Sequence, residues 1–281
     1  MENALISTLI CTYNAESFIS KTLDSVINQD YQNQEILIWD DCSNDNTLEV
    51  LYAYQKKDKR IHIFSESKKL WSFWWLNYLL EKAKWEYIAI QDHDDIRHSE
   101  KLRRQISFLK EHKYYLWCWT GTLMYYWKSR VGFLSIMEHW KKKNPYVFAH
   151  TSMVYRNLWY RYDTSVEFLC DLFFLRYILC KNKPLLGIIP LPLTLHYCKE
   201  TGWNYSEQWF KFNFKNIKRF FDIYWFNLYI IFLLIYLSLL NLLPYKIRNR
   251  IDSWLLFNIK WAKTKVILEK NTYLKQMLSY Y

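Results

Sequence analysis

Short apolar runs of strand type alternate with helical stretches along the first part of the chain. From Ser17 apolar residues recur at helical spacing, a second helical stretch follows Ser43, and a third covers about 72–83. The strand-type runs are 5–11, 35–39, 61–64 and 87–90. Strands that alternate with helices at this spacing predict an α/β fold, in which helices cover both faces of a parallel sheet.

The second part of the chain is less regular. Strand-like regions are predicted at 116–126 and 147–155, and a helix at about 166–180. A chain of 281 residues can bury one core of ordinary size and carry an extension. We therefore expect one domain over 1–206 and an appended segment over 207–281.

Polar side chains follow the predicted strands where each of them ends. Because ligands of open parallel sheets bind beyond the carboxyl ends of the strands, we expect these side chains to converge on one edge. No G-x-G-x-x-G or G-x-x-x-x-G-K-[ST] motif follows any strand, which argues against a dinucleotide enzyme and a P-loop ATPase. The side chains are Tyr13, Asp40, Asp41, Asp92, Asp94 and Asp95.

The run Gln91-Asp92-His93-Asp94-Asp95 places three carboxylates at one strand end. They repel one another unless a cation lies among them, and a hard divalent ion with oxygen ligands is the natural occupant. The alternative is a solvated acidic turn. At the second strand, a carboxylate of Asp41 can accept hydrogen bonds from a base or ribose, while Ser43 or Asp45 can begin the next helix as an N-cap.

Three segments, 8–14, 39–45 and 86–95, resemble the motifs of family 2 glycosyltransferases in order and spacing. The resemblance covers about the first 200 residues. It implies a GT-A fold, a Rossmann-like and mostly parallel sheet flanked by helices, with a nucleotide-binding half over 1–115 and an acceptor half over 116–206. It also implies a nucleotide-sugar donor and a divalent cation, Mg²⁺ or Mn²⁺.

The resemblance assigns the donor side residue by residue. Tyr13 and Asp41 match the positions that contact the base and ribose. Asp92 and Asp94 match the D-x-D pair, with Asp94 as metal ligand and Asp92 beside the donor and the metal. Asp95 is left with a role in shaping the turn.

On the acceptor side, Asp171 matches the acidic residue that begins a helix and acts as general base on the acceptor hydroxyl. The glutamate that usually precedes it is Cys170 in this chain. His150 resembles a residue of the segment that lines the acceptor, and His196 is a candidate for a third metal contact. The alternative for Asp171 is an exposed helical aspartate without a catalytic role. The alternative for His150 and His196 is a purely structural role.

The segment 207–281 is strongly basic, with 12 Lys or Arg against four Asp or Glu. Within it 223–245 carries no charged residue and has basic residues on both sides. This pattern predicts a helical extension that spans a membrane or lies on its anionic surface, and it argues against nucleic acid as a partner. Six scattered cysteines and the absence of a recognisable signal peptide predict a cytoplasmic protein, peripheral or monotopic at the inner face of the cell membrane.

The chain contains four glycines and 15 tryptophans, whereas average usage of about 7% would give about 20 glycines. Trp71, Trp74, Trp75 and Trp85 lie in the stretch where the family pattern has its glycines, and Trp85 falls on the last of them. Trp117 and Trp119 lie where the backbone is expected to approach closely. We therefore hypothesise that many tryptophans are UGA codons of a genetic code that reads UGA as glycine. The alternative is a genuinely tryptophan-rich protein.

The expected activity is transfer of a sugar from a nucleotide-sugar to an acceptor hydroxyl with inversion, in the synthesis of cell-envelope polysaccharide or lipopolysaccharide. A glycan or a lipid-linked acceptor is expected. A nucleotidyltransferase is the rival enzyme, but it would usually carry a glycine-rich basic loop after the first strand. A non-catalytic, membrane-associated sugar-binding or scaffold protein is the rival of another class.

Overall fold

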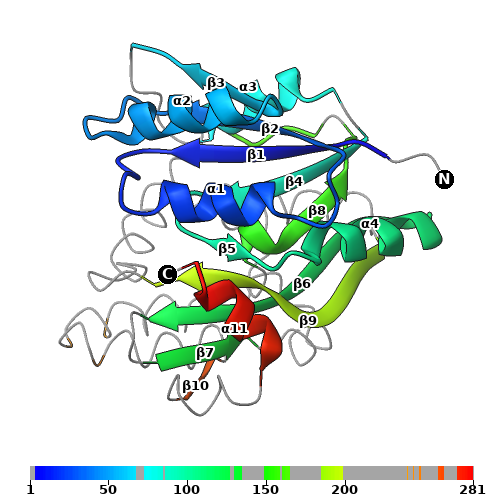
Figure 1. Ribbon diagram of the computed structural model, residues 1–281. Coiled ribbons are helices and arrows are strands. Elements are labelled where there is room, and N and C mark those ends of the chain that lie inside the picture. The colour runs from blue at the N-terminus through cyan, green and yellow to red at the C-terminus, as the bar shows by residue number, and fades with distance from the viewer. Residues whose placement is uncertain are drawn as a thin grey trace.

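The computed structural model describes 4–67, 73–84, 86–126, 130–134, 149–158, 160–164, 185–198, 259–262 and 271–280, together with residues 239, 243 and 247. These residues form a ten-stranded mixed sheet with helices on both of its faces (Figure 1). The main path through the sheet runs β10-β7-β6-β8-β4-β1-β2-β3, with β5 and β9 paired beside it.

The first half of the sheet is parallel, as the sequence predicts. Its strands are β1 (Ile6–Thr12), β2 (Gln34–Asp40), β3 (Ile61–Ser65) and β4 (Tyr87–Asp92). β1 lies between β2 and β4, and β3 pairs with the outer side of β2. The carboxyl ends of β1, β2 and β4 therefore meet at one edge.

Helices cover the two faces of this parallel half. α1 (Ile19–Ile27) and α2 (Thr47–Lys57) pack on one face against Ile36 and Ile38 of β2. α3 (Trp74–Lys82) lies on the other face, where the ring of Tyr78 meets that of Trp39 at 5.2 Å. Alternate residues of β2 thus face opposite helix layers, which is why its sequence is apolar almost throughout.

The second half of the sheet is mixed, so the expectation of a mostly parallel sheet holds only for the first half. β8 (Met153–Arg156) lies antiparallel between β4 and β6 (Tyr115–Tyr126), and the 3-10 turn η2 (His150–Ser152) precedes it. β7 (Arg130–Leu134) and β10 (Ile259–Ala262) extend this side, also antiparallel. The predicted helix at about 166–180 lies outside the described residues.

β9 (Leu185–Tyr197) crosses most of the second half (Figure 1). It runs parallel to β6, and its last part pairs antiparallel with the short β5 (Ile96–Arg97). The β6–β9 register shifts at Gly121, where an added Cβ would lie 2.8 Å from the carbonyl oxygen of Leu191. Glycine therefore permits the close approach of these two strands.

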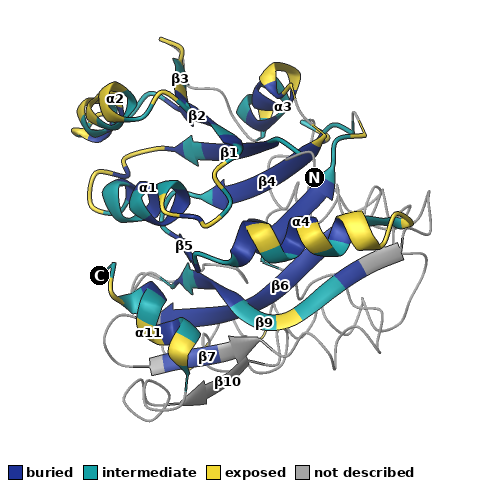
Figure 2. Ribbon diagram, turned by 45° about the vertical axis from the view of Figure 1, so that its right-hand side comes forward, coloured by how far each residue is buried: buried dark blue, intermediate teal, exposed yellow. Residues whose placement is uncertain are grey.

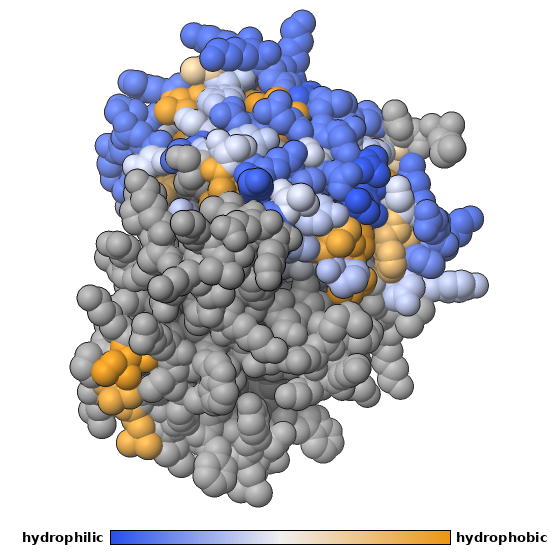
Figure 3. Space-filling view, turned by 60° about the horizontal axis from the view of Figure 1, so that its bottom comes forward, coloured by the Kyte–Doolittle hydropathy of each residue, from blue (hydrophilic) through white to orange (hydrophobic). Residues whose placement is uncertain are grey.

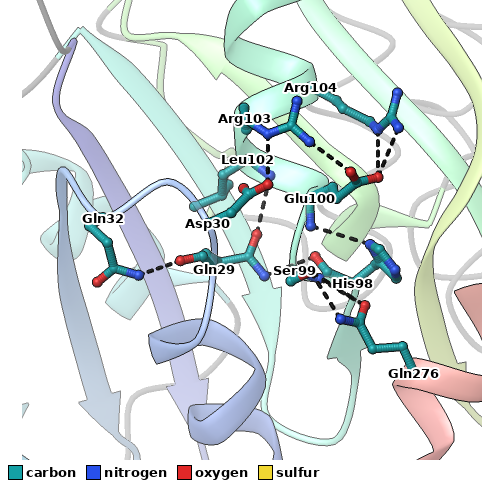
Figure 4. Close-up of polar contacts among 10 residues, drawn as sticks. All are labelled: Gln29, Asp30, Gln32, His98, Ser99, Glu100, Leu102, Arg103, Arg104 and Gln276. Atoms are coloured by element: carbon teal, nitrogen blue, oxygen red, sulfur yellow. Dashed lines mark hydrogen bonds and ion pairs between the residues drawn. The ribbon is translucent and has the colours of Figure 1, made fainter.

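A hydrogen-bond network anchors α4 (Lys101–Glu111), which follows β5 (Figure 4). Gln29, just after α1, donates to the carbonyl of His98 at 2.9 Å and accepts from the amide of Leu102 at 3.2 Å. Gln276 donates to the hydroxyl of Ser99 at 3.0 Å. The segment that links β5 to α4 is thereby fixed from two sides.

Gln276 belongs to α11 (Thr272–Leu278), a helix of the predicted extension. Leu274 and Met277 are fully buried against Ile96 and Leu195. Figure 2 shows α11 with its buried side toward β9 and its exposed side outward. Within 207–281, the strand β10 thus belongs to the same sheet as the rest of the fold, and the helix α11 packs on it.

No helix among the described residues is long and apolar enough to cross a bilayer. The uncharged run 223–245 lies outside them, apart from residues 239 and 243. On the face drawn in Figure 3 the described surface is largely hydrophilic, and its apolar residues form small groups. Membrane association of the extension stays a prediction.

Candidate functional site

The loops after β1 and β2 are tied together by their own side chains. The amide of Asn14 donates to the hydroxyl of Ser43 at 2.9 Å, and the side-chain oxygen of Asn14 accepts from the amide of Asn44 at 2.9 Å. Asn14 and Cys42 have positive φ angles of 48° and 59°, which turn the chain sharply at both strand ends. The two loops therefore form one unit at the carboxyl edge of the sheet.

Asp40 and Asp41 have different surroundings although they are neighbours. The fully buried Asp40 accepts hydrogen bonds from the hydroxyls of Thr12, at 2.9 Å, and Ser43, at 2.5 Å. Asp41 donates its backbone amide to the carbonyl of Thr12 at 2.9 Å. Asp40 thus holds the loops together, whereas Asp41 follows it at the strand end beside Tyr13, whose side chain is 39% exposed.

The N-cap of α2 is Asn46 and not Ser43 or Asp45 as predicted, but Asp45 stabilises the start of this helix from the position before the cap. Its carboxylate accepts from the amides of Thr47 and Glu16, each at 3.1 Å. The first of these bonds lies at the beginning of α2, and the second joins the loop after β1 to α2. Asp45 therefore fixes the start of this helix.

The acidic cluster follows β4 in a tight turn. Asp92, His93 and Asp94 are half-buried, whereas Asp95 is fully buried. The ring of His93 contacts the neighbouring strand, since its Nδ1 lies 3.1 Å from the carbonyl oxygen of Cys11 near the end of β1. The hydroxyl of Thr22 on α1 donates to the carbonyls of His93, at 2.8 Å, and Asp95, at 3.1 Å.

The end of β9 brings His196 to this turn from about one hundred residues away in sequence. β5 and β9 pair with Ile96 opposite Leu195, so their neighbours Asp95 and His196 meet. Nδ1 of His196 lies 2.9 Å from both carboxylate oxygens of Asp95. Ligand atoms of Asp92, Asp95 and His196 all lie within 4.8 Å of one another, a spacing that suits a metal ion.

The charges of the cluster act on His196. Burial alone would lower the pKa of this imidazole, but Asp95, Asp94 and Asp92 raise it to about 9. Burial also raises the pKa of Asp95, while the hydrogen bonds from His196 and Tyr197 oppose that change. The site is therefore strongly electronegative and favours a positive group near these three carboxylates.

η2 forms another wall of the site. The hydroxyl oxygen of Thr151 accepts a hydrogen bond from the backbone amide of Asp92 at 3.4 Å. The neighbouring His150 lies with Nε2 2.8 Å from the hydroxyl of Tyr162, and burial lowers the pKa of His150 to about 3. His150 is thus neutral at physiological pH and takes part in a polar contact beside the acidic turn.

The structure brings together most of the residues that the sequence singled out. Tyr13 and Asp41 lie at neighbouring strand ends, and Asp92 and His196 share the candidate metal centre. Asp94 is next to this centre but outside the group of three. Asp171 lies outside the described residues, so its role as general base stays a prediction.

The sequence did not predict that Asp95 binds His196. It also did not predict that Thr22 and Thr151 form hydrogen bonds with the backbone of the acidic turn. The run of acidic residues pointed to Asp95, but its partner His196 can be found only through the pairing of β5 with β9. The hydroxyls of Thr22 and Thr151 carry no motif of their own.

The described tryptophans occupy ordinary backbone conformations. Trp117 and Trp119 are buried on β6 with their rings stacked at 6.0 Å, and Trp117 also stacks on Tyr155 at 4.4 Å. Among the described residues other than glycine, only Asn14, Cys42 and Phe73 have positive φ. Trp71 and Trp85 lie outside the described residues, and the UGA hypothesis stays a prediction.

The parallel half-sheet and the acidic site at its carboxyl edge define an α/β protein whose ligands are expected beyond the carboxyl ends of the strands. Residues 7–163, more than half of the chain, match the glycosyl transferase family 2, and the chain belongs to this family. The resemblance of its three motifs is thereby confirmed.

Two curated relatives are similar over part of the chain. The putative teichuronic acid biosynthesis glycosyltransferase TuaG of Bacillus subtilis is 36% identical over 107 residues, which cover 38% of this chain and 42% of TuaG. The Escherichia coli enzyme WfgD, named as a UDP-Glc:alpha-D-GlcNAc-diphosphoundecaprenol beta-1,3-glucosyltransferase, is 36% identical over 109 residues, or 39% of this chain and 42% of WfgD. The match thus spans about two fifths of these relatives.

Two solved structures share the fold. Residues 1–349 of Staphylococcus aureus TarS, in complex with UDP, superpose with a TM-score of 0.57 at 19% identity, over 73% of this chain and 62% of that one. The mannosyltransferase PcManGT of Pyrobaculum calidifontis, in complex with GDP-Man and Mn²⁺, gives 0.60 at 14% identity, over 76% and 64%. These similarities show a GT-A type fold.

Proposed function

We propose that this protein transfers a sugar from a nucleoside-diphosphate sugar to an acceptor hydroxyl, with inversion, in the synthesis of a cell-envelope polysaccharide. One observation carries the proposal: Asp92, Asp95 and His196 offer ligand atoms within 4.8 Å of one another at the strand edge where Tyr13 and Asp41 also lie. The names of the relatives support the choice of glycan, since TuaG is assigned to teichuronic acid and WfgD to a lipid-linked acceptor.

The donor set fits a divalent cation. Carboxylates and one imidazole suit Mn²⁺ better than Mg²⁺, which prefers oxygen ligands throughout. Asp92 and His196 would hold the ion, with Asp94 beside them. When bound, the ion neutralises the diphosphate and stabilises the charge that develops on the leaving group.

The other residues bind and orient the substrates. Tyr13 offers a half-exposed aromatic ring to the base, and Asp41 accepts hydrogen bonds from the ribose. Asp171 is proposed to take the proton of the acceptor hydroxyl as this hydroxyl attacks the anomeric carbon. The acceptor is proposed to be a glycan or a lipid-linked glycan at the inner face of the cell membrane, with the basic extension on its anionic surface.

The donor can be found by thermal denaturation with UDP-, GDP- and dTDP-sugars in the presence of Mn²⁺, because a ligand that binds only the folded state raises the melting temperature. Hydrolysis or transfer is then followed with the donor that gives a shift. We expect Asp92→Ala to abolish binding and turnover. Asp171→Asn should abolish turnover and leave donor binding intact.

The two rival functions give other results. A scaffold or sugar-binding protein would show no turnover with any donor, although a sugar could still stabilise it. A nucleotidyltransferase would release pyrophosphate from a nucleoside triphosphate and a sugar phosphate. Either result would overturn the proposal.

A further inference from the structure

Asp95 makes more contacts in the site than its place in the turn suggests. Its side chain is fully buried, and both of its oxygens lie 2.9 Å from Nδ1 of His196. One of them, Oδ1, also accepts the backbone N–H of Tyr197 at 3.0 Å. The carboxylate therefore faces the end of β9 and holds both the ring and the backbone of that strand.

The backbone of Asp95 is fixed as firmly as its side chain. Its carbonyl accepts from the side-chain amide of Gln91 at 2.8 Å and from the hydroxyl of Thr22 at 3.1 Å. Gln91 is itself held by the fully buried Arg97, whose Nε donates to Oε1 at 2.7 Å. Asp95 thus has little freedom to move toward a ligand.

We propose that Asp95 is a positioning residue that orients His196 as a ligand of the metal ion. By accepting the Nδ1 proton, Asp95 fixes the plane of the imidazole, so that Nε2 is the nitrogen that gives up its proton and offers a lone pair when the ion binds. Although the oxygens of Asp95 lie within 4.8 Å of the ligand atoms of Asp92 and His196, they already bind Nδ1 of His196 and the amide of Tyr197, so in this proposal Asp95 supports the site and does not itself coordinate the ion. This inference rests on the proposed function, because it presupposes a cation at Asp92 and His196.

The substitution Asp95→Asn tests this role with almost no change in shape. The amide that replaces the carboxylate has one oxygen and one NH₂ group. If the oxygen accepts the N–H of Tyr197, the NH₂ group donates to Nδ1 of His196 and the ring proton must move to Nε2. If the amide is turned around, two donors face each other at Tyr197, which is unfavourable.

We expect Asp95→Asn to bind Mn²⁺ about 10- to 100-fold more weakly than wild type in the presence of the donor nucleotide, measured by electron paramagnetic resonance. Asp24→Asn is the matched control: it also neutralises one carboxylate that accepts a hydrogen bond, here from the hydroxyl of Tyr54 on α2 at 2.7 Å, and Asp24 is half-buried and is not one of the residues of the candidate metal centre. The control should bind Mn²⁺ as wild type does. Circular dichroism of both variants checks the fold.

A second measurement needs no variant. In wild type loaded with Cd²⁺ as a diamagnetic probe, ¹H–¹⁵N spectra of labelled histidine should show the proton on Nδ1 and the metal on Nε2 of His196. Metal coordination at Nδ1 would overturn the inference. It would also be overturned if wild type binds Mn²⁺ and Asp95→Asn binds it with the same affinity. If wild type itself binds no Mn²⁺ with any nucleotide, the proposed metal-dependent function fails, and this inference fails with it.

Discussion

At the scale of single residues, two adjacent aspartates at the end of β2 have different hydrogen-bond partners. Asp40 is fully buried and accepts hydrogen bonds from Thr12 and Ser43, whereas Asp41 begins the loop beside the exposed Tyr13. The sequence motifs assign the contact with the base and ribose to Asp41 and give Asp40 no role. Their separate hydrogen-bond partners distinguish them.

We expect Asp40→Ala to lower the free energy of unfolding by about 1–3 kcal/mol or more, because the hydroxyls of Thr12 and Ser43 lose a buried acceptor. Urea denaturation measures the change. An unaltered midpoint would show that Asp40 does not hold the two loops together.

Asp41→Asn should have the opposite profile. The midpoint of urea denaturation should stay close to that of wild type, while the affinity for the donor nucleotide falls, since a charged acceptor for the ribose is replaced by a neutral amide. Titration calorimetry with UDP, GDP and dTDP measures the affinity. Equal nucleotide binding by the variant and wild type would remove Asp41 from the donor site.

At the scale of elements, α1 fixes the turn that carries the acidic cluster. The hydroxyl of Thr22 bonds the carbonyls of His93 and Asp95, although about 70 residues separate the helix from the turn. Thr22→Val keeps the shape and removes the donor, so we expect a loss of about 1 kcal/mol in stability and weaker Mn²⁺ binding. Thr22→Ser should restore both, and denaturation with metal titration checks this.

α11 makes an element-scale contribution from the far end of the described chain. Leu274→Ala should cost about 2–5 kcal/mol, because this side chain is fully buried against the strands that carry Ile96 and Leu195. Lys275→Ala, one residue later on the exposed side of the helix, should change stability by less than about 0.5 kcal/mol. Similar effects of the two substitutions on thermal unfolding would contradict this packing.

Element prediction from the sequence succeeded where the pattern is local. The four parallel strands and three helices of the first half follow from apolar runs and helical spacing, and their polar ends pointed to the site. In the second half the strand predicted at 116–126 is present as β6, but the mixed strand pairing was not predicted, because the pairing of β9 with both β6 and β5 depends on contacts between distant residues. For the same reason, His196 could be named as a candidate ligand, but Asp95 could not be named as its partner.

At the scale of the whole molecule, the low glycine and high tryptophan content leads to a testable hypothesis about the coding sequence. We predict that the coding DNA carries UGA at Trp71, Trp74, Trp75 and Trp85. Glycine in place of Trp71 and Trp85, two of these four positions, should then give more folded protein and a higher melting temperature than the chain as written, whereas Trp74 and Trp75 are helical residues of α3, where glycine is unfavourable. UGG codons at these positions would end the hypothesis.

Trp117 and Trp119 provide a contrast within the same molecule. Their buried, stacked rings fill space on β6, so their replacement by glycine in the present chain should leave a cavity and cost several kcal/mol, about 3–5 for a large aromatic side chain. Thermal melts of single variants measure this cost. Trp117 and Trp119 should therefore respond to glycine in the opposite direction to Trp71 and Trp85.

The packing of α11 behind β5 and β9 has a consequence for how the protein is made. Leu274 and Met277 complete the apolar layer under Ile96, Leu195 and Tyr197, the neighbours of Asp95 and His196. These two residues are translated long after the acidic turn has left the ribosome. During synthesis the acidic turn after β4 is therefore present before the apolar layer beneath it is complete. We expect the candidate metal centre to become rigid only after α11 has left the ribosome and packed against β5 and β9.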